Sequence, residues 1–239
     1  MKVLVACEFS QIVTEAFTKL GHYTMSCDLL PAEKNYPHYQ GDILDVLSNH
    51  WDEFDLMIAH PPCTYLTLAG NRWMKPEYKT RYPNREKQRE EAIDFFMLLM
   101  EAPIPKIAVE NPIGIMSRIY RKPDQIIQPF QFGHDVRKPT CLWLKNLSPL
   151  LPTQIVSPRL HTDKNGHTDS YFHYYSFNLP AKERSKYRSR TFQGIAEAMA
   201  NQWGNKAGNN IDLSSLGVTS RPPISPPKRY LDHLCFHFT

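Results

Sequence analysis

Short apolar runs alternate with amphipathic stretches through the first half of the chain. Runs at residues 2–7, 23–29, 54–59 and 106–111 predict strands, and the first of these can be buried on both faces. Between the runs, apolar residues recur at helical spacing in two groups: Ile12, Val13, Ala16, Phe17 and Leu20, and Ala92, Ile93, Phe96, Met97 and Met100. This alternation predicts parallel βαβ units with right-handed crossovers, so the expected fold class is α/β with a mostly parallel sheet.

The second half of the chain is less regular. Residues 140–144 predict a strand, and Pro139 just before them places the start of that strand at a sheet edge. Residues 149–185 are rich in proline, histidine and tyrosine with little periodicity, which indicates a compact irregular lobe. A helix at 194–203 carries an apolar stripe and is expected to pack back onto the core.

Composition narrows the class of protein. With 239 residues, 41% of them hydrophobic, the chain can bury one core with a small appended lobe. Its five cysteines show no paired spacing and its amino terminus is unlike a signal peptide, so we expect a reducing cytoplasmic setting without disulfides. No apolar run approaches ~20 residues, which argues against a membrane span. The net charge of +4 weakly favours a polyanionic partner, and the shift to Gly, Asn, Ser and Pro from residue 205 predicts a flexible tail.

The strand predicted at 54–59 is followed by a cysteine that could act as a nucleophile. His60 is followed by Pro61, Pro62 and Cys63, and proline cannot donate to a strand ladder, so the strand stops there. The thiol therefore leaves the carboxyl end of a strand, where ligands bind in α/β proteins. A buried, inert thiol is the alternative, because most free cysteines are of that kind.

A second polar tip ends a later strand. Glu110 and Asn111 close the run at 106–111. Because the carboxyl ends of parallel strands meet in one crevice, we expect Glu110 and Cys63 to converge. A thiol beside a carboxyl suits covalent addition to an electrophile with proton delivery from the acid. A lone glutamate at a strand end is more often a salt-bridge partner or a helix cap.

Residues early in the chain indicate an adenosine-containing cofactor. Glu8, Phe9 and Ser10 open the first helix, where backbone N–H groups favour an anionic group. Asp28 ends the second strand, a position suited to a ribose diol, and Asp42 could reach an adenine amino group. The first turn lacks G-x-G-x-x-G and the chain has no Walker A sequence, so NAD and P-loop nucleotides are disfavoured.

Together these residues resemble the DNA cytosine-5 methyltransferase family, most closely its short phage and prophage members. The specific part of the likeness is Pro-Pro-Cys63 combined with Glu110-Asn111. The residues that look like the family's S-adenosylmethionine site are Phe9, Ser10, Asp28 and Asp42. The resemblance implies a Rossmann-like methyltransferase sheet with a small recognition lobe.

The resemblance also implies a domain organisation and a reaction. Residues 1–148 and 187–204 would form the catalytic domain, 149–186 a target-recognition lobe and 205–239 the tail. Cys63 would attack C6 of a cytosine flipped out of double-stranded DNA while Glu110 protonates N3. The activated C5 would take the methyl group of S-adenosylmethionine, and a base would remove the C5 proton. The expected enzyme is a monomer without a metal, in the cytoplasm of a bacterium or a phage-infected host cell.

Three sets of site residues follow from the resemblance. The catalytic set is Cys63, Glu110, Asn111 and Arg137, the last in a degenerate form of the family's arginine-bearing motif. The cofactor-binding set is Cys7, Glu8, Phe9, Ser10, Asp28, Leu29, Asp42, Ile43, His60 and Pro61. The DNA-binding set is Arg72, Arg81, Arg85, Lys138, Arg188 and Arg190. Residues 71–89 are expected to form a mobile loop that closes over the base. A solvated cationic surface is the alternative for Arg137, Arg188 and Arg190.

Two departures from the family leave other functions open. Gln11 stands where the family usually has glycine, and its side chain is expected to enter the cofactor space, weakening binding or favouring a modified cofactor. The recognition lobe is short, so we expect short or relaxed sequence specificity. The alternatives are a catalytically impaired, methyltransferase-derived DNA-binding protein, and a variant that acts on nucleotides or uses a modified cofactor. His233, Cys235 and His237 fit a metal site poorly.

Overall fold

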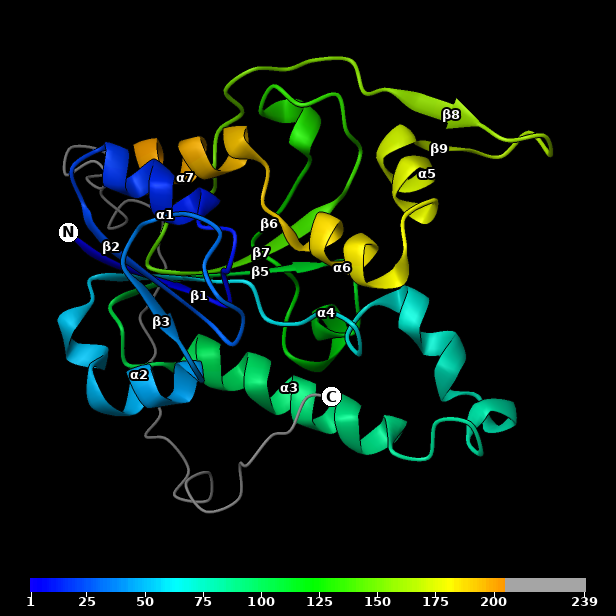
Figure 1. Ribbon diagram of the computed structural model, residues 1–239, viewed down its shortest axis with the longest axis horizontal. Helices are drawn as coiled ribbons and strands as arrows, with labels where there is room; N and C mark the ends of the chain where they lie inside the picture. Colours follow the sequence, from blue (N-terminus) through cyan, green and yellow to red (C-terminus); the bar gives the residue numbers. More distant parts are fainter. Residues whose placement is uncertain (205–239) are drawn as a thin grey trace, which may run out of the picture. The chain divides into compact units, whose positions relative to one another are not determined.

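A seven-stranded sheet forms the centre of the fold (Figure 1). The computed structural model describes residues 1–204, so the predicted tail and the motif of His233, Cys235 and His237 lie outside the described residues. The spatial order of the strands is β3-β2-β1-β4-β5-β7-β6. Their bounds are β1 (Lys2–Ala6), β2 (Tyr23–Asp28), β3 (His38–Gln40), β4 (Leu56–Ala59), β5 (Lys106–Pro112), β6 (Gln125–Ile127) and β7 (Thr140–Lys145).

Most of the sheet is parallel. The four pairings from β3 across to β5 are parallel, and β7 runs antiparallel to both β5 and β6. The predicted α/β class with a mostly parallel, Rossmann-like sheet is therefore confirmed. The strand order reverses between β1 and β4, and ligands of such sheets bind at the carboxyl ends of the strands beside that reversal. The topology thus singles out the edge formed by the ends of β1, β4 and β5.

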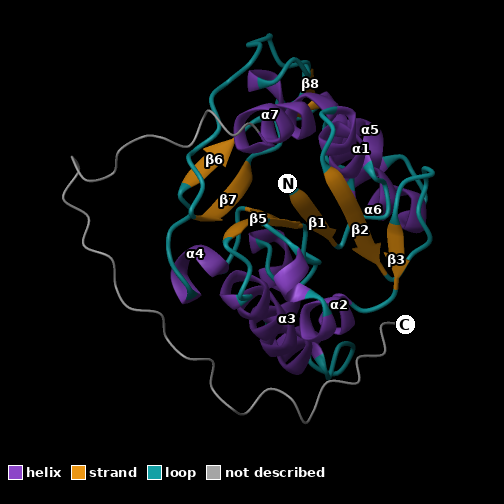
Figure 2. Cartoon of the chain, turned by 90° about the vertical axis from the view of Figure 1, so that its left-hand side faces the viewer, coloured by secondary structure: helices purple, strands orange, loops and turns teal. Residues whose placement is uncertain are grey.

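Helices cover both faces of the sheet (Figures 1 and 2). One face carries α1 (Ile12–Lys19) and α7 (Gln193–Gly204), and the other carries α2 (Ile43–Asn49), α3 (Arg85–Glu101) and α4 (Met116–Ile119). Alternate strand residues enter two separate cores, with Val3 and Val5 in one, and Leu4 and Ala6 in the other. Burial on both faces explains why the central strands are apolar without alternation. No helix within residues 1–204 is long and apolar enough to cross a membrane.

The antiparallel part of the sheet corrects one prediction. β7 lies between β5 and β6 rather than at an edge of the sheet. Pro139 precedes the first residue of β7, so its missing N–H leaves no gap in the ladder. The partner strand β6 has only three residues, and a strand this short shows no recognisable pattern of apolar and polar positions in the sequence.

The helix predicted around Ala92 begins earlier than its apolar spacing indicates. α3 starts at Arg85, and the segment before it contains two short 3-10 helices, η2 (Leu68–Met74) and η3 (Pro76–Tyr78). Because the first two turns of α3 are polar, apolar periodicity does not reveal them. The basic stretch at 71–89 is therefore partly helical. Two further 3-10 turns are η1 (Trp51–Glu53) and η4 (Pro129–Gln131).

Residues 149–186 contain regular structure as well as loops. A hairpin of β8 (Leu160–Thr162) and β9 (Thr168–Ser170) is followed by α5 (Tyr171–Phe177) and α6 (Ala181–Ser189). Phe172 of α5 is buried and stacks on Tyr187 of α6, with 4.9 Å between the ring centroids. This aromatic pair packs the segment internally, whereas Tyr174, Tyr175 and Phe177 are exposed.

Candidate active site

The strand register brings residues of β1, β4 and β5 to one edge of the sheet. Ala6 is paired with Ala59, and Ala59 is paired with Val109. The next residue on each of the three segments stands one step further toward the carboxyl end: Cys7, His60 and Glu110. The amide of His60 donates to the carbonyl of Ala6 at 3.0 Å, so the alignment continues past the last paired residues.

His60 and Glu110 form a largely buried ion pair at this edge. His60 Nδ1 lies 2.9 Å from Glu110 Oε2, and the two side chains are 10% and 17% exposed. Burial disfavours the charged form of each group, but the pairing outweighs burial, so the pKa of His60 is raised and the pKa of Glu110 is lowered. The pair therefore keeps its shared proton to a higher pH than an isolated imidazole would.

The Cys63 thiol lies within electrostatic range of Glu110. The thiol is half-buried, and burial raises its pKa, while the ammonium of Lys138 acts in the opposite direction and the charge of Glu110 raises the pKa further. The chain turns back after Cys63, since the amides of Leu66 and Thr67 donate to its carbonyl at 3.0 and 3.1 Å. The thiol thus follows the end of β4 by four residues, and His60, between them in the chain, pairs with Glu110.

Asn111 ties the segment before Cys63 to β5. Its side chain is buried, and Nδ2 donates to the carbonyl of Pro61 at 2.9 Å. Because Pro61 and Pro62 each have a restricted backbone, this hydrogen bond limits the directions in which the thiol can leave β4. Asn111 Oδ1 is buried and has no hydrogen-bond partner among residues 1–204.

Lys138, rather than Arg137, is the cation that acts on the site. The charge of Lys138 affects the pKa of three site groups: His60, Cys63 and Glu110. Its ammonium is held by a hydrogen bond to the carbonyl of Arg188 at 2.7 Å. The side chain of Arg137 is exposed, and its amide donates to Ser170 Oγ at 3.1 Å. The Lys138 charge thus acts on these three groups, and the catalytic role of Arg137 stays a prediction.

The Glu8 carboxylate occupies the amino-terminal end of α1. It accepts from the amides of Val13 and Thr14 at 2.7 and 3.1 Å, and from the hydroxyl of Thr14 at 2.7 Å. The sequence interpretation reserves these N–H groups for an anionic part of the cofactor. That interpretation is wrong, because a carboxylate of the chain itself satisfies the N–H groups.

Cys7, Asp28 and Asp42 gather beside the ends of β1 and β2 and the start of α2. Burial raises the pKa of Cys7 well above its usual range, and the charges of Asp28 and Asp42 add to this effect. Asp28 Oδ1 accepts from the amide of Leu30 at 2.9 Å, and Asp42 Oδ1 caps α2 by accepting from the amide of Leu44 at 3.0 Å. Within residues 1–204, no three His, Cys, Asp or Glu side chains are placed to hold a metal ion. The charged groups that act on Cys7 are therefore carboxylates.

The remaining residues of the cofactor-binding set differ in exposure. Phe9, Ser10, Ile43 and Pro61 are buried, whereas Leu29 is 55% exposed. Ile43 is the first residue of α2 and packs into one of the two cores. Among these five residues, Leu29 alone presents most of its side chain to solvent.

The Gln11 side chain packs against β2. It is fully buried, and Nε2 donates to Ser26 Oγ at 2.9 Å and to the carbonyl of Tyr36 at 3.0 Å. The backbone of Gln11 has a φ of 54°, in the left-handed region that favours glycine. The two hydrogen bonds hold the side chain against β2 and the segment before β3, and the effect of Gln11 on cofactor binding stays a prediction.

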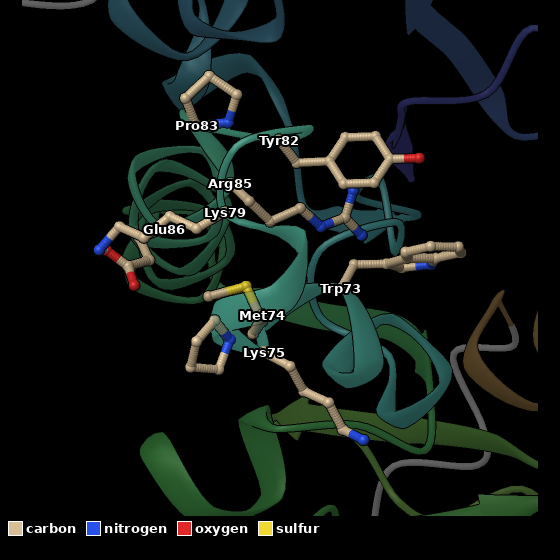
Figure 3. A pocket seen from close by; sticks show the side chains of 9 residues that line it. Trp73, Met74, Lys75, Lys79, Tyr82, Pro83, Arg85 and Glu86 are labelled. Atoms are coloured by element: carbon tan, nitrogen blue, oxygen red, sulfur yellow. The ribbon is translucent and has the colours of Figure 1, made fainter.

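A pocket of about 150 Å³ opens on the basic stretch (Figure 3). Arg72 and Arg81 stack on two of the rings nearby, 4.1 Å from the centroid of Trp73 and 5.4 Å from that of Tyr82. The side chains that line the pocket are Trp73, Met74, Lys75, Pro76, Lys79, Tyr82, Pro83, Arg85 and Glu86. This pocket belongs to the segment that follows the thiol, and its lining includes neither Cys63 nor Glu110.

Arg85 and Arg89, one turn apart on α3, hold the segment that follows the thiol. Arg85 donates to the carbonyl of Thr64 at 3.4 Å, and Arg89 Nε donates to the carbonyl of Tyr65 at 3.0 Å. Arg89 also donates to Asn71 Oδ1 at 2.7 Å. Arg85, which the sequence interpretation assigns to DNA, is thus engaged with the backbone of the site.

Arg188 and Arg190 are engaged within the protein. Arg190 donates to both carboxylate oxygens of Glu33 at 2.7 Å, and Lys186 forms an ion pair with the same carboxylate at 2.7 Å. Arg188 Nε donates to Ser176 Oγ at 2.7 Å. These partners leave the two arginines less available to a phosphate than the exposed arginines of the basic stretch.

Comparison with known proteins yields a distant structural likeness. No family model matches the sequence, and no curated protein matches it. Among solved structures, the chain is similar to a protein described as a "putative DNA modification methyltransferase" encoded within a prophage (E. coli), with 14% sequence identity and a TM-score of 0.43. The match covers 66% of this chain and 52% of that chain, so this chain spans about half the length of that protein. A likeness this distant carries no weight for function, and the fold assignment rests on the sheet topology.

Two features of the site escape the sequence interpretation. The pairing of His60 with Glu110 follows from the register of β4 on β5, in which Ala59 is paired with Val109, so it cannot be read from either strand alone. The role of Arg89 depends on where α3 begins, because only a helix that includes Arg85 places the two arginines on one face.

Proposed function

We propose that this chain is an S-adenosylmethionine-dependent enzyme that methylates cytosine at C5 in DNA. The observation that carries the proposal is the ion pair of Glu110 with His60, which stands at the end of β4 three residues before Cys63, at the carboxyl edge of a Rossmann-like sheet. A nucleophile and an acid at a ligand-binding edge suit covalent addition to a ring carbon with proton delivery. Residues 1–148 and 187–204 would form the catalytic domain of a monomeric cytoplasmic enzyme, and 149–186 its recognition lobe.

Cys63 and Glu110 divide the proposed chemistry. As the Cys63 sulfur bonds to C6 of cytosine, the C5–C6 double bond opens and Glu110 delivers a proton to N3. The electron pair that becomes available at C5 would form the bond to the methyl carbon that S-adenosylmethionine supplies, as the bond from that carbon to the sulfonium sulfur breaks and S-adenosylhomocysteine leaves. A base then removes the C5 proton, the double bond re-forms, and the bond between C6 and the sulfur breaks. The thiolate is returned for the next cycle, and Asn111 keeps its segment in place throughout.

The carboxylates beside the ends of β1 and β2 fit the proposed cofactor. S-adenosylmethionine would supply a methyl group from a positively charged sulfonium, and Asp28 and Asp42 place negative charge beside Cys7, while the charge of Glu8 acts on Asp28. Asp28 uses Oδ1 for the amide of Leu30, and we assign its other oxygen to the ribose hydroxyls. The hydrogen bonds that hold the Gln11 side chain against β2 and the segment before β3 support an unmodified cofactor.

DNA would approach over the segment that follows the thiol. Arg72, Lys75, Lys79 and Arg81 are exposed there and can neutralise phosphates. Because the thiol is half-buried, the target base would have to leave the duplex to reach it. The small size of the lobe at 149–186 supports a short recognition sequence.

Trapping on DNA that contains 5-fluorocytosine tests the proposal. After methyl transfer the fluorine cannot leave as a proton does, so an active Cys63 stays bonded to C6. We expect an adduct stable to denaturation that requires S-adenosylmethionine and is lost in Cys63→Ser but kept in Cys235→Ser, the matched cysteine control. A wild-type protein that binds cofactor and DNA without forming the adduct would instead be a DNA-binding relative that lacks catalysis. An adduct with free 5-fluoro-dCTP but none with DNA would assign the activity to nucleotides.

A further inference from the structure

His60 stands beside Glu110 at the strand-end edge, and the proposed reaction gives it no part. The distance of 2.9 Å between His60 Nδ1 and Glu110 Oε2 is that of a hydrogen bond, and only 10% of the His60 side chain is exposed. The backbone of His60 is fixed in two ways: its amide donates to the carbonyl of Ala6, and the next residue is Pro61. The imidazole therefore has a defined partner and little freedom to leave it.

We propose that His60 is a positioning residue that keeps a proton available to Glu110 and so sets the pH range in which Cys63 adds to cytosine. This inference rests on the proposed function. As the bond from sulfur to C6 forms, an N–H bond of the imidazolium breaks, its proton passes through the Glu110 carboxyl to N3, and the ring becomes neutral. When the C5–C6 double bond re-forms, the proton returns from N3 by the same route.

Several charged groups face the pair from neighbouring elements. Burial opposes the charge on His60, while Glu110 and Glu8 favour it and Lys138 opposes it. Glu110 is also close enough to affect Cys63, after β4, and Cys141, in β7. The hydrogen-bonded Glu110 is the strongest of the favourable partners, so the proton stays with the pair.

The second ring nitrogen of His60 supports a role in the liganded state. Nε2 is buried and has no hydrogen-bond partner among the described residues. A neutral ring with its hydrogen on Nδ1 leaves only a lone pair at Nε2, whereas a charged ring presents an N–H that needs an acceptor. A bound base or cofactor can supply that acceptor, and its arrival would then favour the charged ring that delivers the proton.

The pH dependence of trapping on 5-fluorocytosine DNA tests the inference with His60→Asn. Asparagine keeps a donor near the position of Nδ1 but cannot take up a proton, so Glu110 alone must hold it. A free glutamic acid has a pKa of about 4.3 and a free histidine about 6.5. We expect the alkaline limit of the trapping rate to move to lower pH by about one unit or more, with a loss of roughly tenfold at pH 8. DNA affinity should stay the same.

The matched control is His50→Asn, which removes a histidine whose Nδ1 lies 2.9 Å from Glu53 Oε1 at the surface. Its trapping profile should equal that of the wild type. If the wild-type protein forms the adduct and His60→Asn shows the same alkaline limit, the inference is overturned and the proposed function stays intact. Wild-type protein that traps at no pH would overturn the proposed function itself.

A spectroscopic readout covers the case in which His60→Asn does not fold. In wild-type protein with isotope-labelled histidine, NMR should show an imidazole with a pKa above 6.5, lowered in Glu110→Gln. The other imidazoles should titrate unchanged. If no histidine resonance responds to Glu110→Gln, the two side chains do not share a proton in solution and the inference is wrong.

Discussion

At the residue scale, the charge of Lys138 and the burial of Cys63 have opposite effects on the pKa of the thiol. Burial and the charge of Glu110 both raise the pKa of Cys63, and the Lys138 ammonium lowers it. Removing this charge should therefore raise the pKa of Cys63 and reduce the fraction of thiolate at pH 8. We predict that iodoacetamide alkylates Cys63 more slowly in Lys138→Met than in the wild type, and that Lys122→Met reacts at the wild-type rate. Peptide mass spectrometry over a range of pH measures the rates. An equal rate in the two variants would show that the Lys138 charge does not reach the thiol.

Gln11 offers a second prediction at this scale. Its buried amide donates to Ser26 and Tyr36, so Gln11→Ala should lower the free energy of unfolding by about 1–3 kcal/mol. Gln11→Gly should cost less than Gln11→Ala, since glycine adopts the φ of 54° without strain. Chemical denaturation measures both. A glycine variant less stable than the alanine variant would contradict the left-handed backbone at this position.

At the element scale, α3 supports the segment that carries the thiol. Arg89 joins α3 to the carbonyl of Tyr65 and to Asn71, within a few residues of Cys63. We predict that Arg89→Ala slows adduct formation by about tenfold, because the thiol is no longer held in position, with DNA affinity little changed. Lys87→Ala, an exposed neighbour paired with Glu91 at 3.7 Å, is the control. A loss of DNA affinity at an unchanged rate would assign Arg89 to DNA contact instead.

Elements with apolar patterns are predictable from the sequence, and elements without them are not. The strands β1, β4 and β5 are buried on both faces, so their runs of apolar residues stand out. The polar first turns of α3 and the three-residue β6 leave no such signal. The edge position predicted from Pro139 is wrong because proline disrupts a ladder only within a strand, and here it stands just outside.

At the scale of the whole molecule, the prediction that Cys63 and Glu110 meet follows from a general rule about the carboxyl ends of parallel strands. The pairing of His60 with Glu110 needed the register of two strands about 50 residues apart, which no local pattern encodes. The choice between Arg137 and Lys138 depends on which way a loop turns before β7. The role of Glu8 as a cap depends on the first residue of α1, a boundary that spacing does not locate to one residue.

A structure of the protein trapped on 5-fluorocytosine DNA tests the central claim most directly. The account predicts a covalent bond between Cys63 Sγ and C6 of a base flipped out of the duplex. It also predicts a Glu110 carboxyl oxygen within about 3.2 Å of N3, with His60 on the far side of that carboxyl. A base bonded to another residue, or a Glu110 side chain turned away from the ring, would contradict it.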